Sequence, residues 1–112
     1  MMKENDMNIL QAHEIAIAAA KDAANKYFQQ YGDRDACGFS WVKANIDGRT
    51  KIARELKKVG FDRAWNYGYD FWNPSKMPVQ SISVLEKGSY AYAEKMNELL
   101  ETDVFFAQSR MD

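Results

Sequence analysis

The stretch that most constrains the fold of this chain runs from residue 61 to residue 74, FDRAWNYGYDFWNP. Its six aromatic side chains are Phe61, Trp65, Tyr67, Tyr69, Phe71 and Trp72. Aromatic rings dominate the energetics of protein cores, but this stretch also carries aspartate, arginine and asparagine, which resist burial. We therefore expect one side of the stretch in the core and the other side on a binding surface.

The length and composition are typical of one globular domain. The chain has 112 residues, 46% of them hydrophobic and 28% charged, and a chain of this size buries about 65% of its unfolded surface. We expect residues 1–112 to form a single domain, with the polar residues 1–7 disordered. The single cysteine, Cys37, excludes an intrachain disulfide and favours a reducing cytoplasm. We expect no membrane span, because no apolar run approaches about 18 residues. We expect no signal peptide, because the first residues, MMKENDMN, are polar and mixed in charge.

Residue patterns predict three helices and four strands. Apolar residues recur at spacings of three and four in 8–31, 49–59 and 85–101, which predicts helices. The first helix is rich in alanine, so a neighbouring element could pack closely against it. Alternation predicts strands at 37–44, within 61–72, at 77–84 and at 102–108. This mixed order predicts an α+β fold, with a small mixed or antiparallel sheet of about four short strands.

The charge of the chain is unevenly distributed. The net charge is −1, yet residues 43–63 hold seven basic and three acidic side chains. Such a basic middle segment can attract an anion, but it is too small to wrap duplex nucleic acid. The predicted second helix opens with Arg49 and Lys51, which together with free N–H groups could hold a phosphate. The simpler alternative is a helix with solvated cationic side chains.

The sequence contains no recognisable metal or catalytic set. His13 and Cys37 are its only classical soft ligands, whereas a zinc site needs about four. We expect His13 at the surface or half-buried. We expect Cys37 as a small buried side chain, because Asp33 and Asp35 disfavour the thiolate that catalysis requires. The prediction includes no catalytic residue, no metal and no cofactor.

The aromatic and basic side chains of the middle segment are the candidate ligand-binding residues. They are Trp41, Lys43, Arg49, Lys51, Arg54, Arg63, Trp65, Tyr67, Tyr69 and Trp72. Aromatic faces beside arginine and lysine suit a nucleotide or a short single strand, through stacking and phosphate contacts. They equally suit a protein surface, where tryptophan, tyrosine and arginine are the usual hot-spot residues.

Several segments together resemble a family of short uncharacterised proteins of tailed bacteriophages. They are DRDACGFSWVKA (33–44), KKVGF (57–61), WNP (72–74), KGSYAYAEKMNELL (87–100) and SRMD (109–112). The resemblance covers the chain from about Ala18 onwards and brings no established activity or catalytic residues. It implies a viral protein that acts in the cytoplasm of an infected bacterial cell, or one carried in the virion. It also favours a binding function directed at a host component over metabolic enzymology.

The functional prediction is a non-enzymatic phage accessory protein that binds a small anionic ligand such as a nucleotide. The alternative is a protein–protein interaction module or an inhibitor of a host protein, acting through the same aromatic surface. A weaker alternative is an enzyme with a site near Cys37. The prediction also leaves a homodimer open, because a small aromatic-rich chain can complete its core or pocket across a two-fold interface.

Overall fold

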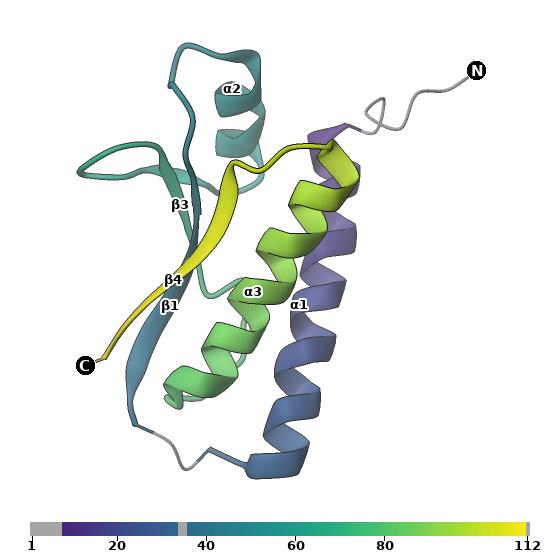
Figure 1. The fold of residues 1–112 in the computed structure, drawn as a ribbon, viewed down its shortest axis with the longest axis vertical. Coiled ribbons are helices and arrows are strands. Elements are labelled where there is room, and N and C mark those ends of the chain that lie inside the picture. Colours follow the sequence, from purple (N-terminus) through teal and green to yellow (C-terminus); the bar gives the residue numbers. More distant parts are fainter. Residues whose placement is uncertain (1–7, 34–35, 112) are drawn as a thin grey trace.

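The computed structural model describes residues 8–33 and 36–111. These residues form three helices and a four-stranded sheet in one compact body (Figure 1). The elements in chain order are α1 (Ile9–Tyr31), β1 (Gly38–Ala44), α2 (Lys51–Lys58), β2 (Asp62–Arg63), β3 (Tyr69–Trp72), α3 (Ile82–Leu100) and β4 (Phe105–Met111). The predicted α+β fold is confirmed. The prediction for residues 1–7 lies outside the described residues.

The sheet is antiparallel throughout, with the order β2-β3-β1-β4. Strands β1 and β2 are therefore parallel to each other, are separated by β3 and are connected through α2. Strands β3 and β4 are related in the same way, with β1 between them and α3 as the connection. The chain from β1 to β4 thus has the β-α-β-β-α-β connectivity of interlocked split β-α-β units, preceded by the additional helix α1.

Helices α1 and α3 lie side by side on one face of the sheet (Figure 1). Four alanines at four-residue spacing, Ala12, Ala16, Ala20 and Ala24, are fully buried along α1. Small side chains let two helices approach closely, as the alanine-rich sequence predicts. Gly88 on α3 serves the same contact, because a Cβ there would lie 2.7 Å from the Cβ of Ser75 and 3.5 Å from the Ala20 carbonyl oxygen.

The aromatic stretch divides between the core and the surface, as its composition predicts. Phe61, Tyr69 and Phe71 are buried under the helices, and the Phe61 and Phe71 rings stack with centroids 5.1 Å apart. Trp65 and Trp72 remain on the surface, 95% and 46% exposed. The hairpin between β2 and β3 explains the division, because Trp65 falls in its loop and Trp72 faces away from the helices.

The predicted strand at 77–84 is wrong. Within that range only Ser81 makes a strand-like contact, an isolated bridge with Cys37, and α3 begins at Ile82. The Ser81 side chain accepts from the Val84 N–H as an N-cap. Its own N–H donates to Oδ1 of Asp33 at 2.8 Å. The alternating serines therefore belong to a helix start, where serine is favoured for this hydrogen bond.

The last strand also lies further along the chain than predicted, at 105–111. Glu101 ends α3 in the left-handed conformation (φ 54°). The Asn97 side chain then fixes the start of β4, because its Nδ2 donates to the Phe105 carbonyl at 2.8 Å and its Oδ1 accepts from the Phe105 N–H at 3.1 Å. Helix α2 is shorter than predicted, because Thr50 caps it and Val59 ends it.

Candidate functional site: the open face of the sheet

One face of the sheet points away from α1 and α3. Side chains alternate across a strand, and the pairing register settles which of them share this face. The residues on it are Phe39, Trp41 and Lys43 from β1, Asp70 and Trp72 from β3, and Phe106, Gln108 and Arg110 from β4. The sequence predicted that one side of β1 carries Phe39, Trp41 and Lys43, and the structure confirms it.

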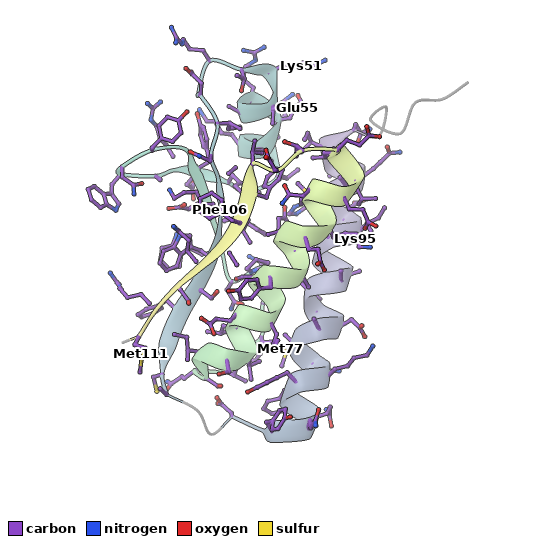
Figure 2. The ribbon with its side chains drawn as sticks, in the orientation of Figure 1. Lys51, Glu55, Met77, Lys95, Phe106 and Met111 are labelled. Atoms are coloured by element: carbon purple, nitrogen blue, oxygen red, sulfur yellow. The ribbon has the colours of Figure 1, made fainter. Side chains whose placement is uncertain are left out.

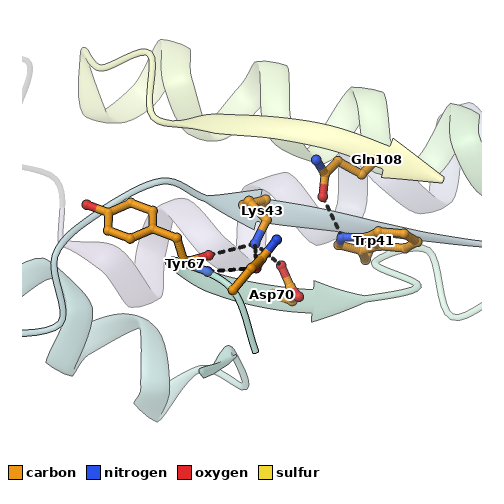
Figure 3. A network of polar contacts seen from close by, with 6 residues as sticks. Trp41, Lys43, Tyr67, Asp70 and Gln108 are labelled. Atoms are coloured by element: carbon orange, nitrogen blue, oxygen red, sulfur yellow. Dashed lines mark hydrogen bonds and ion pairs between the residues drawn. The ribbon is translucent and has the colours of Figure 1, made fainter. Parts of the chain in front are cut away.

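Three rings form an aromatic cluster on this open face, namely Phe39, Trp41 and Trp72. Trp41 and Trp72 are register partners on the two central strands, with ring centroids 4.6 Å apart and planes inclined by 31°. Phe39 meets Trp72 edge to face at 6.4 Å. Nε1 of Trp41 donates to Oε1 of Gln108 at 2.9 Å, which fixes the orientation of the indole (Figure 3). The cluster thus presents ordered ring faces to solvent.

A hollow of about 350 Å³ lies beside the aromatic cluster. It exists because the pairing of β3 with β1 ends before β1 does. The final hydrogen bond between them runs from the Asn73 N–H to the Ser40 carbonyl, at 3.0 Å. The chain then turns away and returns where the Gly38 N–H donates to the Gln80 carbonyl. Phe39 and Trp72 line the hollow together with the polar side chains of Asn73 and Gln80. A volume of this size is enough for one planar ring ligand.

Cys37 also lines this hollow, and its thiol is exposed. The prediction of a buried cysteine is therefore wrong, because Cys37 directly precedes β1 and lies at the rim of the sheet. Its Sγ contacts Oε1 of Gln80 at 3.3 Å, which is a neutral amide oxygen. A reactive thiol needs a base or a positive charge nearby, and this contact supplies neither.

Lys43, a predicted ligand-binding residue, is buried, and Figure 3 shows it between Tyr67 and Asp70. Its ammonium donates to the Tyr67 carbonyl at 2.7 Å and to Oδ1 of Asn66 at 3.2 Å. It also lies 3.1 Å from Oδ1 of Asp70. These contacts hold the β2–β3 hairpin over the sheet, so the charge of Lys43 is not offered to a ligand. Tyr69 is likewise buried, on the helix-facing side of β3.

The remaining predicted residues gather at the other end of the molecule, beyond Ala44 of β1. Arg63, Trp65 and Tyr67 line a second, smaller hollow of about 220 Å³ in the β2–β3 hairpin. Exposed Arg49 forms an ion pair with Asp47 at 3.0 Å, and this hydrogen-bonded guanidinium lowers the pKa of Asp47 to about 2. Lys51 and Arg54 are exposed on α2, and Figure 2 shows Lys51 at the opposite end from Met111.

Sequence reasoning missed five residues of the open face, and three of them form or contact the aromatic cluster: Phe39, Gln108 and Arg110. Phe39 shares the alternation of Trp41, so the pattern contained the signal for it. Arg110 comes from the C-terminal strand, and its guanidinium lies 5.7 Å from the centroid of Phe39. Only the register of β4 against β1 brings it there. It supplies a cation directly beside the aromatic cluster.

His13 is half-buried, as predicted, and its contacts are structural. Nδ1 lies 2.7 Å from the hydroxyl of Tyr92, and burial, followed by the nearby Lys76 charge, lowers the pKa of His13 below 6.5. Within the described part of the chain, no three histidine, cysteine or acidic side chains are grouped so that they could hold a metal ion.

None of the described helices combines the length and the apolar character needed to cross a membrane. Comparison of the chain with protein-family models, with curated proteins and with solved structures found no match.

Proposed function

We propose that this chain is a non-enzymatic binding protein whose ligand is a nucleotide unit, either free or within a short single strand. The observation that carries the proposal is the Trp41–Trp72 pair, which spans the two central strands on the uncovered face of the sheet. Stacking of a base on an aromatic side chain contributes about 1–3 kcal/mol and tolerates any base. By analogy, RNA-recognition modules stack bases on aromatic side chains of a four-stranded sheet.

The surroundings of the aromatic cluster suit the other parts of a nucleotide. Asn73 and Gln80 offer amide donors and acceptors to the edge of a base in the neighbouring hollow. Arg110 stands beside Phe39, where its guanidinium can pair with a phosphate. Because Lys43 is paired with Asp70, the described open-face residues carry one net positive charge, that of Arg110. A single cation favours a small anionic ligand over duplex nucleic acid. The resemblance to short phage proteins would place such binding in an infected bacterial cell.

A ligand panel tests the proposal. Mononucleotides, cyclic nucleotides and short single-stranded oligonucleotides are added separately while the melting temperature and tryptophan fluorescence are recorded. A ligand at a hundred times its Kd stabilises the folded state by about 2.7 kcal/mol. We expect Trp72→Ala to abolish the shift and Trp65→Ala, in the distant hairpin, to retain it. Absence of a shift with every ligand, or equal loss in both variants, contradicts the proposal. The class of ligand that raises the melting temperature shows whether the protein binds a free nucleotide or a short single strand.

A second candidate function is binding of a host protein, and the exposure of Trp65 favours it. This tryptophan is 95% exposed in the β2–β3 hairpin, next to the exposed side chains of Arg63 and Tyr67. Tryptophan, tyrosine and arginine are the residues that most often dominate protein interfaces. A host protein that the wild type captures, that Trp65→Ala fails to capture and that Trp72→Ala still captures would support this candidate. An enzyme near Cys37 stays a prediction, and turnover lost in Cys37→Ser would support it.

A further inference from the structure

The two edge strands of the sheet differ in length and in charge. Strand β2 forms one edge with only two residues, Asp62 and Arg63, both charged and exposed. Strand β4 forms the other edge with seven residues, of which only Arg110 is charged. Short or charged edges discourage pairing with another chain, whereas a long uncharged edge invites it. Figure 2 shows Phe106 and Met111 along this long edge.

The backbone of β4 offers hydrogen-bonding groups to the outside. The Asn45 N–H donates to the Val104 carbonyl at 2.9 Å, and in an antiparallel ladder such groups alternate in direction. The N–H and C=O groups of Phe105, Ala107 and Ser109 therefore point away from β1. The side-chain amide of Asn97 is hydrogen-bonded to both the N–H and the C=O of Phe105. For Ala107 and Ser109, no backbone partner occurs in the described part of the chain.

A groove of about 510 Å³ runs between this edge and α3. Lys87, Tyr90 and Glu94 line it from α3, and Phe106 lines it from β4. The ring of Tyr90 is 63% exposed. An added strand would extend the sheet along this groove, at about 4.8 Å from β4, and cover apolar surface of both elements.

We propose that this edge pairs with the same edge of a second copy, antiparallel, about a two-fold axis at Gln108. In this register Ala107 of each copy faces Ser109 of the other, and both exchange their outward N–H and C=O groups. Phe106 of each copy then stands opposite Arg110 of the other on the open face, where a cation–π contact is favourable. Two sheets join into one, and Arg110 of each copy borders the open face of the other. The inference does not depend on the identity of the ligand.

The charges along α3 favour this register. Asn97 is hydrogen-bonded to Phe105 and Glu86 to Ser109, so the level of Gln108 on α3 falls between Glu86 and Asn97, near Ser89 and Tyr90. A two-fold axis there places Lys87 of each copy within reach of Glu94 of the other. Two ion pairs form when each Lys87 ammonium leaves the Tyr27 ring of its own copy, whose centroid lies 5.6 Å away. An axis at Ser109 would instead bring the two Glu86 carboxylates together, and like charges at short distance repel.

Sedimentation equilibrium over a range of concentrations tests the proposal. We expect the wild type to dimerise and Ala107→Pro to be monomeric. The Ala107 N–H is not part of the β1 ladder, and proline is tolerated where the N–H faces outward at an edge. Ala107→Ser, which keeps the N–H, is the matched control and should still dimerise. A wild type that stays monomeric at its highest soluble concentration, or a dimer that survives in Ala107→Pro, overturns the proposal.

Two further variants test the register without disturbing the strand. Lys87→Glu and Glu94→Lys should each weaken the dimer about tenfold, the effect expected of two exposed ion pairs, and the double exchange should restore it. In a Cys37→Ser background, Gln108→Cys should form a disulfide between copies on oxidation, because opposed Cβ atoms lie about 5 Å apart. Arg110→Cys, which faces Phe106 of the other copy, should not. Insensitivity to the charge exchange, or cross-linking at 110 rather than 108, overturns the Gln108 axis.

Discussion

Nζ of Lys43 lies 3.1 Å from Oδ1 of Asp70, and the side chains of both residues are largely shielded from water. The contact is an ion pair without good hydrogen-bond alignment, because Lys43 directs its donors to Tyr67 and Asn66. The pair ties the centre of the sheet to the hairpin that carries Trp65. A buried pair of this kind is most sensitive to the loss of one partner.

We expect Lys43→Met to lower the free energy of unfolding by about 3–5 kcal/mol, because it leaves the Asp70 carboxylate buried without its counter-charge. The double variant Lys43→Met, Asp70→Leu should recover most of this loss. Urea denaturation of the wild type, both single variants and the double variant measures the coupling. Additive losses in the double variant would show that the two residues act independently.

The contact between His13 and Tyr92 predicts a pH dependence of stability. Burial lowers the pKa of His13 in the folded state below its ordinary 6.5, so below pH 6.5 the unfolded chain binds a proton that the folded chain does not. The free energy of unfolding should therefore fall as the pH falls below about 6.5, with a slope of at most about 1.36 kcal/mol per pH unit. Above that pH the residue should contribute no slope.

His13→Gln tests this prediction, because glutamine keeps a partner for the buried Tyr92 hydroxyl but does not titrate. Denaturation curves are recorded between pH 5 and pH 8 and extrapolated linearly to water. The free energy of unfolding should fall less steeply below pH 6.5 in the variant than in the wild type. Parallel pH profiles for the two proteins would mean that His13 is not responsible.

Gly88 is expected to be required for the contact of α3 with the 73–76 turn and α1. Gly88→Ala should destabilise the fold by about 1–3 kcal/mol through overpacking, although alanine is intrinsically the better helix former. The added Cβ would lie 2.7 Å from the Cβ of Ser75. Ser75→Gly removes that atom, so the double variant should be more stable than Gly88→Ala alone. Thermal unfolding measures both, and a stabilised Gly88→Ala would contradict the packing argument.

Arg110 is expected to carry the salt dependence of ligand binding. Arg110→Gln should weaken binding of a charged nucleotide but leave the affinity for an uncharged nucleoside nearly unchanged, since stacking on Trp72 is retained. Titration by tryptophan fluorescence at low and high salt measures the difference. Arg54→Gln on α2 is the matched control and should behave like the wild type. Equal effects of both variants would indicate diffuse attraction and not a contact at the aromatic cluster.

Local patterns predicted much of the secondary structure. The spacing of apolar residues gave α1 almost to the residue, and alternation placed Phe39 and Trp41 on one face of β1. The strand at 77–84 failed because an alternation of serine and aliphatic residues also fits a loop that ends in an N-cap. The prediction for Cys37 failed because its exposure depends on where β3 leaves the sheet.

The candidate site was predictable in part. The excess of aromatic rings indicated that some rings would remain on the surface, and Trp65 and Trp72 do, whereas Tyr69 is buried. Proximity in the sequence was a poor guide to which cations would join them. Lys43 is buried in an ion pair with Asp70, and the basic residues of α2 lie at the other end of the molecule. The cation beside the aromatic cluster is Arg110, which belongs to the C-terminal strand.

The sequence by itself determined which residues of a segment share a face and that the middle of the chain carries more ring surface than its core accepts. These properties follow from helix and strand periodicity, which acts over a few residues. Only the tertiary structure decided that β4 lies beside β1 and leaves a long free edge, and that Trp72 stands opposite Trp41. Strand order and register are set by packing between segments far apart in the chain, and no local pattern specifies them.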